Sequence, residues 1–277
     1  MTKRIYIVRW IVDVLIFLTV SGLLAASFVG KLPLGGPWQW GFHCLDPKLQ
    51  YEFQGDSISA LALFLGSYIG TLIIVIGVGF LSWPSDRSWK KRVKVSFDRY
   101  GCFLVGTLYT LAVTEILKDL AGMPRPHFFH TCQPNASRNC TSGEFIRHFE
   151  CREPRSNDFR ERLMIMDSYK SFPSGHASLT ASTATFIVYF AWKHVRPEWS
   201  RVMSPLLGVL GVTWATWVGV SRVMDRRHHW WDVLVGSLLG VLITSIIILS
   251  HGRRKKMKGS ISKGFDFDNY AYSAKEP

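Results

Sequence analysis

The sequence predicts an all-α membrane protein: a six-transmembrane-helix bundle whose polar motifs collect at one face of the bilayer. Of the 277 residues, 48% are hydrophobic, and they are segregated into long runs. About 20 helical residues cross the hydrocarbon core, whereas an isolated strand would leave its backbone groups unpaired in lipid. The runs are therefore expected to form helices over 10–30, 58–83, 99–118, 176–194, 203–221 and 230–250.

The placement of the basic residues predicts how these helices are oriented. The formal net charge is +13, and much of the excess lies in the short segments 84–97, 195–202 and 253–258. Cytoplasmic loops carry an excess of Lys and Arg, so these segments are expected in the cytoplasm, with both termini, because the number of spans is even. The charge favours contact with anionic membrane lipids. Nucleic-acid binding is not expected, because no nucleic-acid-reading motif is present.

The segments 31–57, 119–175 and 222–229 are then expected outside the cell or in a lumen. Asn135 and Asn139 each begin an acceptor sequence for glycosylation, and both lie in the long outer segment. An oxidising compartment allows one or two disulfides, with three full pairings, among the four cysteines of these segments. These are Cys44, Cys132, Cys140 and Cys151. The plasma membrane is the expected location, with the ER or Golgi as the alternative.

The first of three polar motifs contains Lys118 and Arg125, beside the outer end of the third expected helix. Two cations at the outer end of a membrane span are unexpected, because Lys and Arg are normally in excess on the cytoplasmic side. Interfacial snorkelling of the two side chains is the simple alternative. The combination of a planar guanidinium fork and an ammonium point charge suits a phosphate group, so we predict an anion site here.

The second motif is Pro173-Ser174-Gly175-His176, immediately before the fourth expected helix. Backbone amides at a helix N-terminus favour an anion. Gly175 allows close approach of the backbone, and Ser174 adds a hydroxyl donor. His176 can donate a proton to a leaving oxygen. The alternative is a plain helix cap by Ser174 with an incidental histidine.

The third motif contains Arg222, His228 and Asp232. His228 and Asp232 are four residues apart and are neighbours if this turn is helical. A carboxylate bonded to one ring nitrogen fixes the tautomer and makes the other nitrogen a better nucleophile. A histidine–aspartate pair that only stabilises the helix start is the alternative.

The three motifs together predict a site for a phosphate monoester. They fall on the same expected face of the membrane and combine three cations with two histidines. Because the cations can stabilise the charge on the phosphoryl oxygens, no metal or other cofactor is expected. His127-Phe-Phe-His130 with nearby cysteines lacks the paired spacing of a structural zinc site.

The pattern K-x6-RP, PSGH and SR-x5-H-x3-D, matched at every motif position, resembles the type 2 phosphatidate phosphatase superfamily. That superfamily also includes vanadium haloperoxidases and glucose-6-phosphatase-like enzymes. The resemblance extends over roughly residues 5–250. Gly41-Phe42-His43-Cys44 and the sequence around the first and third motifs are similar to the lipid phosphate phosphatase (phospholipid phosphatase) branch.

The resemblance implies a phosphoric monoester hydrolase with its catalytic site at the extracellular or lumenal face. It implies that His228 forms a phosphohistidine, that Asp232 orients His228, and that His176 protonates the leaving alkoxide and then activates water. The phosphate-binding residues it implies are Lys118, Arg125, Ser174, Gly175 and Arg222. The implied substrates are phosphatidate, lysophosphatidate, sphingosine 1-phosphate and ceramide 1-phosphate, cleaved without Mg²⁺.

Other functions remain as alternatives. The same fold could act on a sugar phosphate or a polyprenyl diphosphate, or serve as a catalytically silent scaffold, although no motif residue is missing. A transporter is disfavoured because the polar residues gather at one face. We expect a membrane phosphatase domain over 1–258 and a disordered cytoplasmic tail over 259–277. Gly236-x-x-x-Gly240 lets another helix approach closely, either within the protein or in a homo-oligomer.

Overall fold

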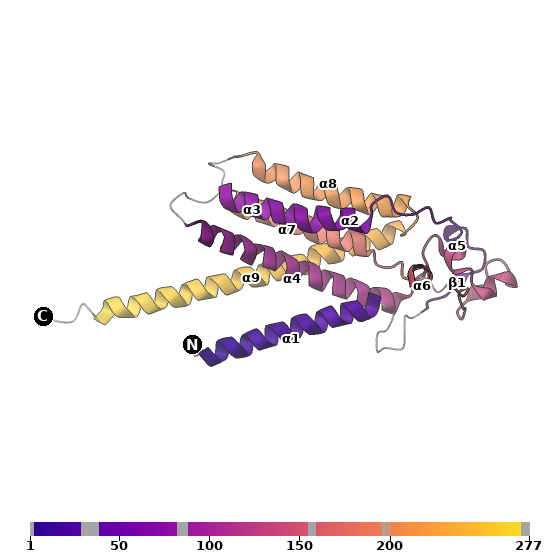
Figure 1. Cartoon of the computed structure of the whole chain (residues 1–277), viewed down its shortest axis with the longest axis horizontal. Coiled ribbons are helices and arrows are strands. Elements are labelled where there is room, and N and C mark those ends of the chain that lie inside the picture. Colours follow the sequence, from indigo (N-terminus) through magenta and orange to yellow (C-terminus); the bar gives the residue numbers. More distant parts are fainter. Residues whose placement is uncertain are drawn as a thin grey trace.

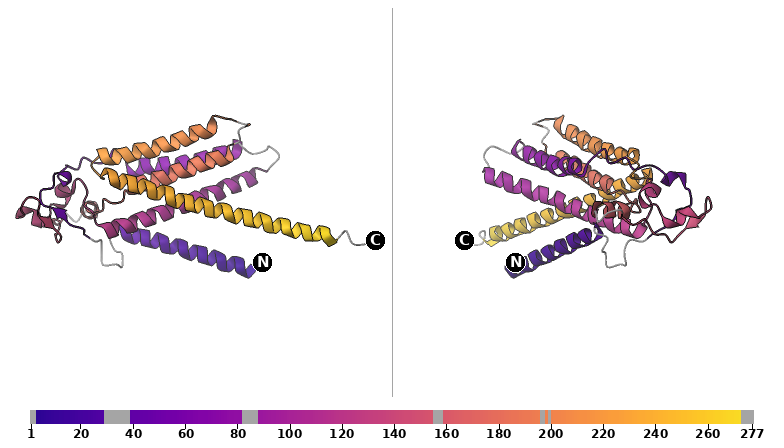
Figure 2. Two further views of the ribbon diagram at one scale, coloured as in Figure 1. Left: turned by 180° about the vertical axis from the view of Figure 1, so that it is seen from behind. Right: turned by 45° about the vertical axis from the view of Figure 1, so that its right-hand side comes forward.

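The computed structural model describes residues 3–28, 39–81, 88–154, 159–195, 198 and 200–272. It is predominantly helical, and its long helices run side by side along one axis (Figure 1). The short elements gather at one end of the bundle, and the chain ends lie at the other (Figures 1 and 2). The long helices are α1 (Lys3–Phe28), α3 (Gly70–Leu81), α4 (Trp89–Ala121), α7 (Gly175–His194), α8 (Met203–Met224) and α9 (Trp230–Tyr272).

A helix lies at each of the six expected positions, but several boundaries differ. The helix expected over 58–83 is divided into α2 (Ala60–Phe64), a π-helical turn η2 (Leu65–Ile69) and α3. Gly66 in this turn lies against the indole ring of Trp214. A Cβ atom at that position would collide with the ring, so the residue at this turn must be small.

Two helices extend past the apolar runs that predicted them. α4 begins at Trp89, so residues 89–97 are helical and the start expected at residue 99 was ten residues too late. α9 continues to Tyr272. The composition of 259–277 predicts a disordered tail, and this stays a prediction. Hydropathy reports which residues contact lipid, whereas helical hydrogen bonds can continue beyond the bilayer. Residues 31–38, 84–87, 155–158, 196–197 and 199 of the expected loops lie outside the described residues.

Four helices within the described residues are long and apolar enough to cross a membrane. They are Ala60–Leu81, Arg92–Ala121, Met203–Met224 and Trp230–His251. The apolar part of α1 is shorter, Val14–Ser27. α7 is 20 residues long but more polar. α7 packs against α4, α8 and α9, so its buried hydroxyls face other helices instead of lipid.

Small residues bring α7 and α9 together. A Cβ atom on Gly240 would collide with the carbonyl oxygen of Ser178, and one on Gly236 would collide with that of Ser174. The hydroxyls of Ser182 and Thr244 share a hydrogen bond of 2.5 Å across the same contact. The Gly236-x-x-x-Gly240 motif is therefore used for packing within the protein.

The short elements at one end of the bundle form a small folded unit, which we call the head. β1 (Phe42–His43) pairs antiparallel with β2 (Phe145–Ile146), so the all-α expectation misses one short ladder. The head also contains η1 (Pro47–Leu49), α5 (Phe128–Cys132), η3 (Asn135–Arg138) and α6 (Phe159–Asp167). Disulfides Cys44–Cys140 and Cys132–Cys151 select one of the three pairings that the sequence allowed. Phe42, Phe128 and Phe149 form its buried aromatic centre.

Candidate active site

The three sequence motifs meet where the bundle joins the head. Lys118 lies in the last turn of α4, which ends at Ala121 and is capped by Gly122 in a left-handed conformation. Ser174 caps the N-terminus of α7. Its backbone N–H donates to the carbonyl oxygen of Asp232 at 3.0 Å, which ties the second motif to the third. The backbone N–H of Arg125 donates to Ser168 at 2.8 Å, in the segment just before the second motif.

His228 is buried and held by the backbone of the segment before the second motif. Its Nδ1 lies 2.7 Å from the carbonyl oxygen of Ser171. A carbonyl oxygen only accepts, so Nδ1 carries the proton and Nε2 keeps its lone pair. Burial, and then the positive charge of Arg125, lowers the pKa of His228 to about 3, so the ring is neutral near pH 7.

Asp232 does not make the hydrogen bond to His228 that the sequence suggested. Its Oδ2 lies 3.7 Å from His228 Nδ1, beyond hydrogen-bonding distance. The same oxygen accepts from the Ser171 hydroxyl at 2.6 Å and from the backbone N–H of His229 at 2.9 Å. The carboxylate and the imidazole are therefore linked through Ser171, which sequence reasoning missed. The position of Ser171, two residues before Pro173, was the only signal for it.

Lys118 is buried beside the start of α7. Its Nζ lies 2.6 Å from Glu115 Oε1, one turn earlier in the same helix. A Cβ atom on Gly175 would lie 3.1 Å from the same Nζ. The absence of a side chain at Gly175 therefore leaves the ammonium group next to the first amides of α7, where an anion is favoured.

Arg125 is 4% exposed and is held by Asp167. Its Nε donates to the carbonyl oxygen of Asp167 at 2.7 Å, and its Nη2 donates to Oδ1 at 2.5 Å. Its Nη1 donates to the carbonyl oxygen of Arg227 at 3.2 Å. Burial acts to raise the pKa of Asp167, but Arg125 and Arg227 outweigh it and hold this pKa well below its usual range.

Arg222 is 1% exposed and lies between two carboxylates. Its Nη1 donates to Asp56 at 2.6 Å, and its Nη2 donates to Asp225 at 2.9 Å. Asp225, for which the sequence suggested no role, also accepts from the backbone N–H of Ser57 at 2.9 Å. Asp225 therefore fixes both the guanidinium and the segment that carries Asp56.

Arg227 is a further cation that the sequence motifs did not identify. Its Nε lies 3.2 Å from Asp56, and its Nη2 lies 3.1 Å from Asp167. It therefore joins the carboxylate partners of Arg222 and Arg125 into one network. Asp56 lies in an irregular segment and Asp167 is the last residue of α6, and neither belongs to a motif, so neither partner could be identified from the sequence.

His176 lies in the first turn of α7, within electrostatic range of Arg222, His228, Lys118 and Arg125. All eight predicted catalytic and phosphate-binding residues thus lie in one region. Its cations and imidazoles can stabilise a phosphoryl group and exchange protons with it. Among the residues that the structure describes, no group of three or more His, Cys, Asp or Glu is placed to hold a metal ion.

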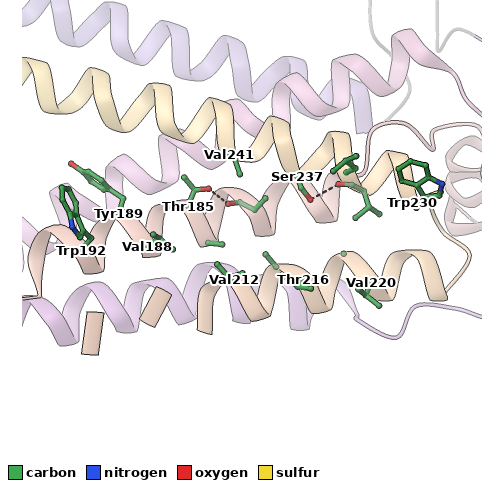
Figure 3. A pocket seen from close by; sticks show the side chains of 16 residues that line it. Thr185, Val188, Tyr189, Trp192, Val212, Thr216, Val220, Trp230, Ser237 and Val241 are labelled. Carbon is green, nitrogen blue, oxygen red and sulfur yellow. Dashed lines mark hydrogen bonds between the residues drawn. The ribbon is translucent and has the colours of Figure 1, made fainter. Parts of the chain in front are cut away.

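A separate apolar groove of about 740 Å³ lies between α7, α8 and α9 (Figure 3). It extends from Trp230 to Trp192, and its lining is mostly aliphatic and aromatic. None of the eight predicted residues lines it. The groove is therefore distinct from the region where the motifs meet.

Buried cations around two histidines, at one end of a bundle of apolar helices, define a membrane phosphatase. The chain belongs to the PAP2 superfamily, whose family model matches residues 99–256. It is 31% identical to phospholipid phosphatase 2 from Bos taurus over 252 residues, covering 87% of this chain and 82% of the bovine protein. It is 30% identical to phospholipid phosphatase 1 from Rattus norvegicus over 221 residues, covering 77% of this chain and 75% of the rat protein. No solved structure matches the chain.

Proposed function

We propose that this phosphatase hydrolyses the phosphate monoesters of lipids through a phosphohistidine on His228. The substrates proposed are phosphatidate, lysophosphatidate, sphingosine 1-phosphate and ceramide 1-phosphate, and the reaction needs no Mg²⁺. The observation that carries the proposal is the hydrogen bond from His228 Nδ1 to Ser171, because it leaves Nε2 as a free nucleophile.

In the first step, the lone pair of Nε2 attacks phosphorus and the bond from phosphorus to the lipid oxygen breaks. His176 donates its proton to that oxygen, so the lipid leaves as a neutral alcohol. In the second step, His176 removes a proton from water, and the resulting hydroxide displaces Nε2 from phosphorus. The products are inorganic phosphate and the original neutral His228.

The phosphate is held by Lys118, Arg125, Arg222, the hydroxyl of Ser174 and the backbone at Gly175. The carboxylate partners of the two arginines keep their guanidinium groups in fixed orientations before substrate binds. Preorganised cations stabilise the charge on the phosphoryl oxygens without reorganisation during the reaction. This role of the cations supports catalysis without a metal ion.

The proposed topology has six membrane-crossing helices, namely the four long apolar ones, α1 and the central α7. The chain ends lie at the end of the bundle opposite the head (Figure 1), which supports an even number of crossings. With the basic segments and both termini in the cytoplasm, the site faces the cell exterior or a lumen. The plasma membrane is the proposed location. The exposed side chains of Asn135 and Asn139 and the two disulfides support this sidedness.

Phosphate release from phosphatidate in detergent micelles containing EDTA tests the proposal. Wild-type protein should release phosphate, and His228→Gln should release none while retaining the wild-type melting temperature. Brief reaction with ³²P-labelled phosphatidate and a base quench should leave acid-labile label on wild type but not on the variant. Full activity of His228→Gln, or dependence of wild type on Mg²⁺, would overturn the mechanism.

A further inference from the structure

We infer that a cavity between α6 and the ends of α1 and α4 receives the acyl chain of the lipid phosphate substrate. We call it the α6 cavity; its volume is about 410 Å³. The inference rests on the proposed function, because it assigns a place to the part of the substrate that the phosphate site does not hold.

The α6 cavity borders the phosphate site at Lys118. Lys118 and Glu115 line it, and Lys118 Nζ lies beside Gly175 at the start of α7. Asp167 also lines it and holds Arg125 through a contact of 2.5 Å. A phosphate bound by Lys118 and Arg125 would therefore have the rest of its molecule at the opening of this cavity.

The lining of the cavity is charged at Lys118, Glu115 and Asp167 and apolar along α6. Four large apolar side chains of α6 line one wall. Three of them, Phe159, Leu163 and Met166, are spaced by four and three residues and so share one helix face. Phe159 is 60% exposed, so its ring is accessible to a hydrocarbon chain. Methionine side chains adapt to irregular apolar shapes, which suits a flexible hydrocarbon chain.

The α6 wall is held in place near both ends. Glu161 in its first turn pairs with Arg152 at 2.7 Å, beside the disulfide at Cys151. Asp167 at its C-terminus is held by Arg125 and Arg227. The opposite side is held by Lys170, which pairs with Asp119 at 2.5 Å and donates to the carbonyl oxygen of Ser27 at 3.2 Å. The cavity is therefore preformed and can discriminate between chains.

The groove of Figure 3 is the competing place for the chain. It is larger and more apolar, but no phosphate-site residue lines it. At the end of this groove nearest the phosphate site, α8 and α9 are in close contact. A Cβ atom on Gly219 would lie only 3.1 Å from Val233 Cγ1. The α6 cavity is favoured because two of its own lining residues contact the phosphate-binding residues.

Matched variants separate the two places. Leu163→Trp fills the α6 cavity, Leu163→Ala enlarges it, and Leu234→Trp makes the same leucine-to-tryptophan change in the groove of Figure 3. The full-length protein is assayed in mixed micelles with dipalmitoyl phosphatidate, dioctanoyl phosphatidate and the chainless p-nitrophenyl phosphate. The readout is kcat/KM for each substrate.

Leu163→Trp should lower kcat/KM for dipalmitoyl phosphatidate by roughly tenfold or more, with a smaller loss for the dioctanoyl lipid. Its hydrolysis of p-nitrophenyl phosphate should match wild type, as should that of Leu163→Ala and Leu234→Trp. An equal loss on all three substrates, or a chain-length shift in Leu234→Trp alone, would overturn the inference. If wild type hydrolyses p-nitrophenyl phosphate but neither lipid, the proposed function itself is wrong.

Discussion

The carbonyl oxygen of Ser171 accepts a hydrogen bond of 2.7 Å from His228 Nδ1. The hydroxyl of the same serine donates to Asp232 Oδ2 at 2.6 Å, and its backbone N–H donates to Met123 at 2.9 Å. One residue thus links the proposed nucleophile, the carboxylate of the third motif and the loop of the first motif. The orientation of His228 depends on this backbone position more directly than on Asp232.

Removal of the Ser171 hydroxyl should therefore impair catalysis without removing a group that touches the substrate. Ser171→Ala keeps the carbonyl that holds His228 but takes one donor from a carboxylate whose Oδ1 already has no partner among the described residues. Hydrogen bonds to charged groups contribute about 1.5–3 kcal/mol. We expect kcat on phosphatidate to fall roughly tenfold to a hundredfold, with KM nearly unchanged.

The matched control is Ser168→Ala, because Ser168 is a fully buried serine in the same loop and, among the described residues, its hydroxyl bonds only the carbonyl oxygen of Ile165. This variant should keep the wild-type kcat. Equal losses in the two variants, or a loss confined to KM, would show that Ser171 does not position the catalytic groups.

Much of the site could be predicted because its residues lie in three short motifs with fixed spacing beside apolar runs. The hydrogen-bonding and ion-pair partners of those residues could not be predicted. Asp56 and Asp167 reach Arg222 and Arg125 only through the folding of the chain outside the three motifs, and no periodicity marks them. The i, i+4 spacing of His228 and Asp232 suggested a direct bond, but the Ser171 carbonyl takes the Nδ1 proton instead.

The sequence also predicted the positions of the helices better than their boundaries. Apolar runs located all six, yet hydropathy alone does not mark the start of α4 at Trp89, because its first turns are basic. α7 is not among the four helices that are apolar enough to cross a membrane, and its buried hydroxyls contact the helices around it.

Acid should destabilise the protein through its buried neutral histidines. Burial, and then Arg125, lowers the pKa of His127 to about 3, and that of His228 is lowered to about 3 for the same reasons. The unfolded chain, with histidine pKa values of about 6.5, then binds protons that the folded state does not. This contribution to stability is complete above about pH 6.5 and is lost as the pH falls toward about 3.

Each of these histidines should lower the free energy of unfolding by about 1.4 kcal/mol per pH unit between about pH 6.5 and about pH 3. The melting temperature in detergent should fall with pH below about 6.5. His127→Gln should fall less steeply, because the amide cannot take up the proton. The exposed His148 provides the control, and His148→Gln should follow wild type. Parallel curves for wild type and His127→Gln would show that His127 gains no proton on unfolding.

The two disulfides should contribute unequally to stability. Cys44–Cys140 joins residues 96 apart in sequence, whereas Cys132–Cys151 joins residues 19 apart. Restricting the unfolded chain predicts about 5 kcal/mol for the longer loop and about 3 kcal/mol for the shorter. Cys44→Ser with Cys140→Ser should therefore lower the melting temperature more than Cys132→Ser with Cys151→Ser. Cys102→Ser, at the cysteine that belongs to neither disulfide, is the control, and a reversed order would show that loop closure does not dominate.

Gly236 should be required for the site as well as for packing. A Cβ atom there would collide with the carbonyl oxygen of Ser174, whose backbone N–H is bonded to Asp232 in the same contact. Gly236→Ala must therefore separate α9 from the start of α7 and move Asp232 away from the second motif. Overpacking of this kind costs about 1–3 kcal/mol, and we expect a lower melting temperature together with a loss of activity at temperatures where the variant is still folded.

Gly77→Ala is the matched control, since a Cβ atom on this helical glycine would have no neighbour within 4 Å. That change should leave activity intact and increase stability slightly, because alanine favours the helix. If Gly236→Ala instead kept full activity and changed only the oligomeric state, the contact of α9 with α7 would not determine the geometry of the site. Coupled losses of activity and stability would show that the packing of two helices sets the distance between the motifs they carry.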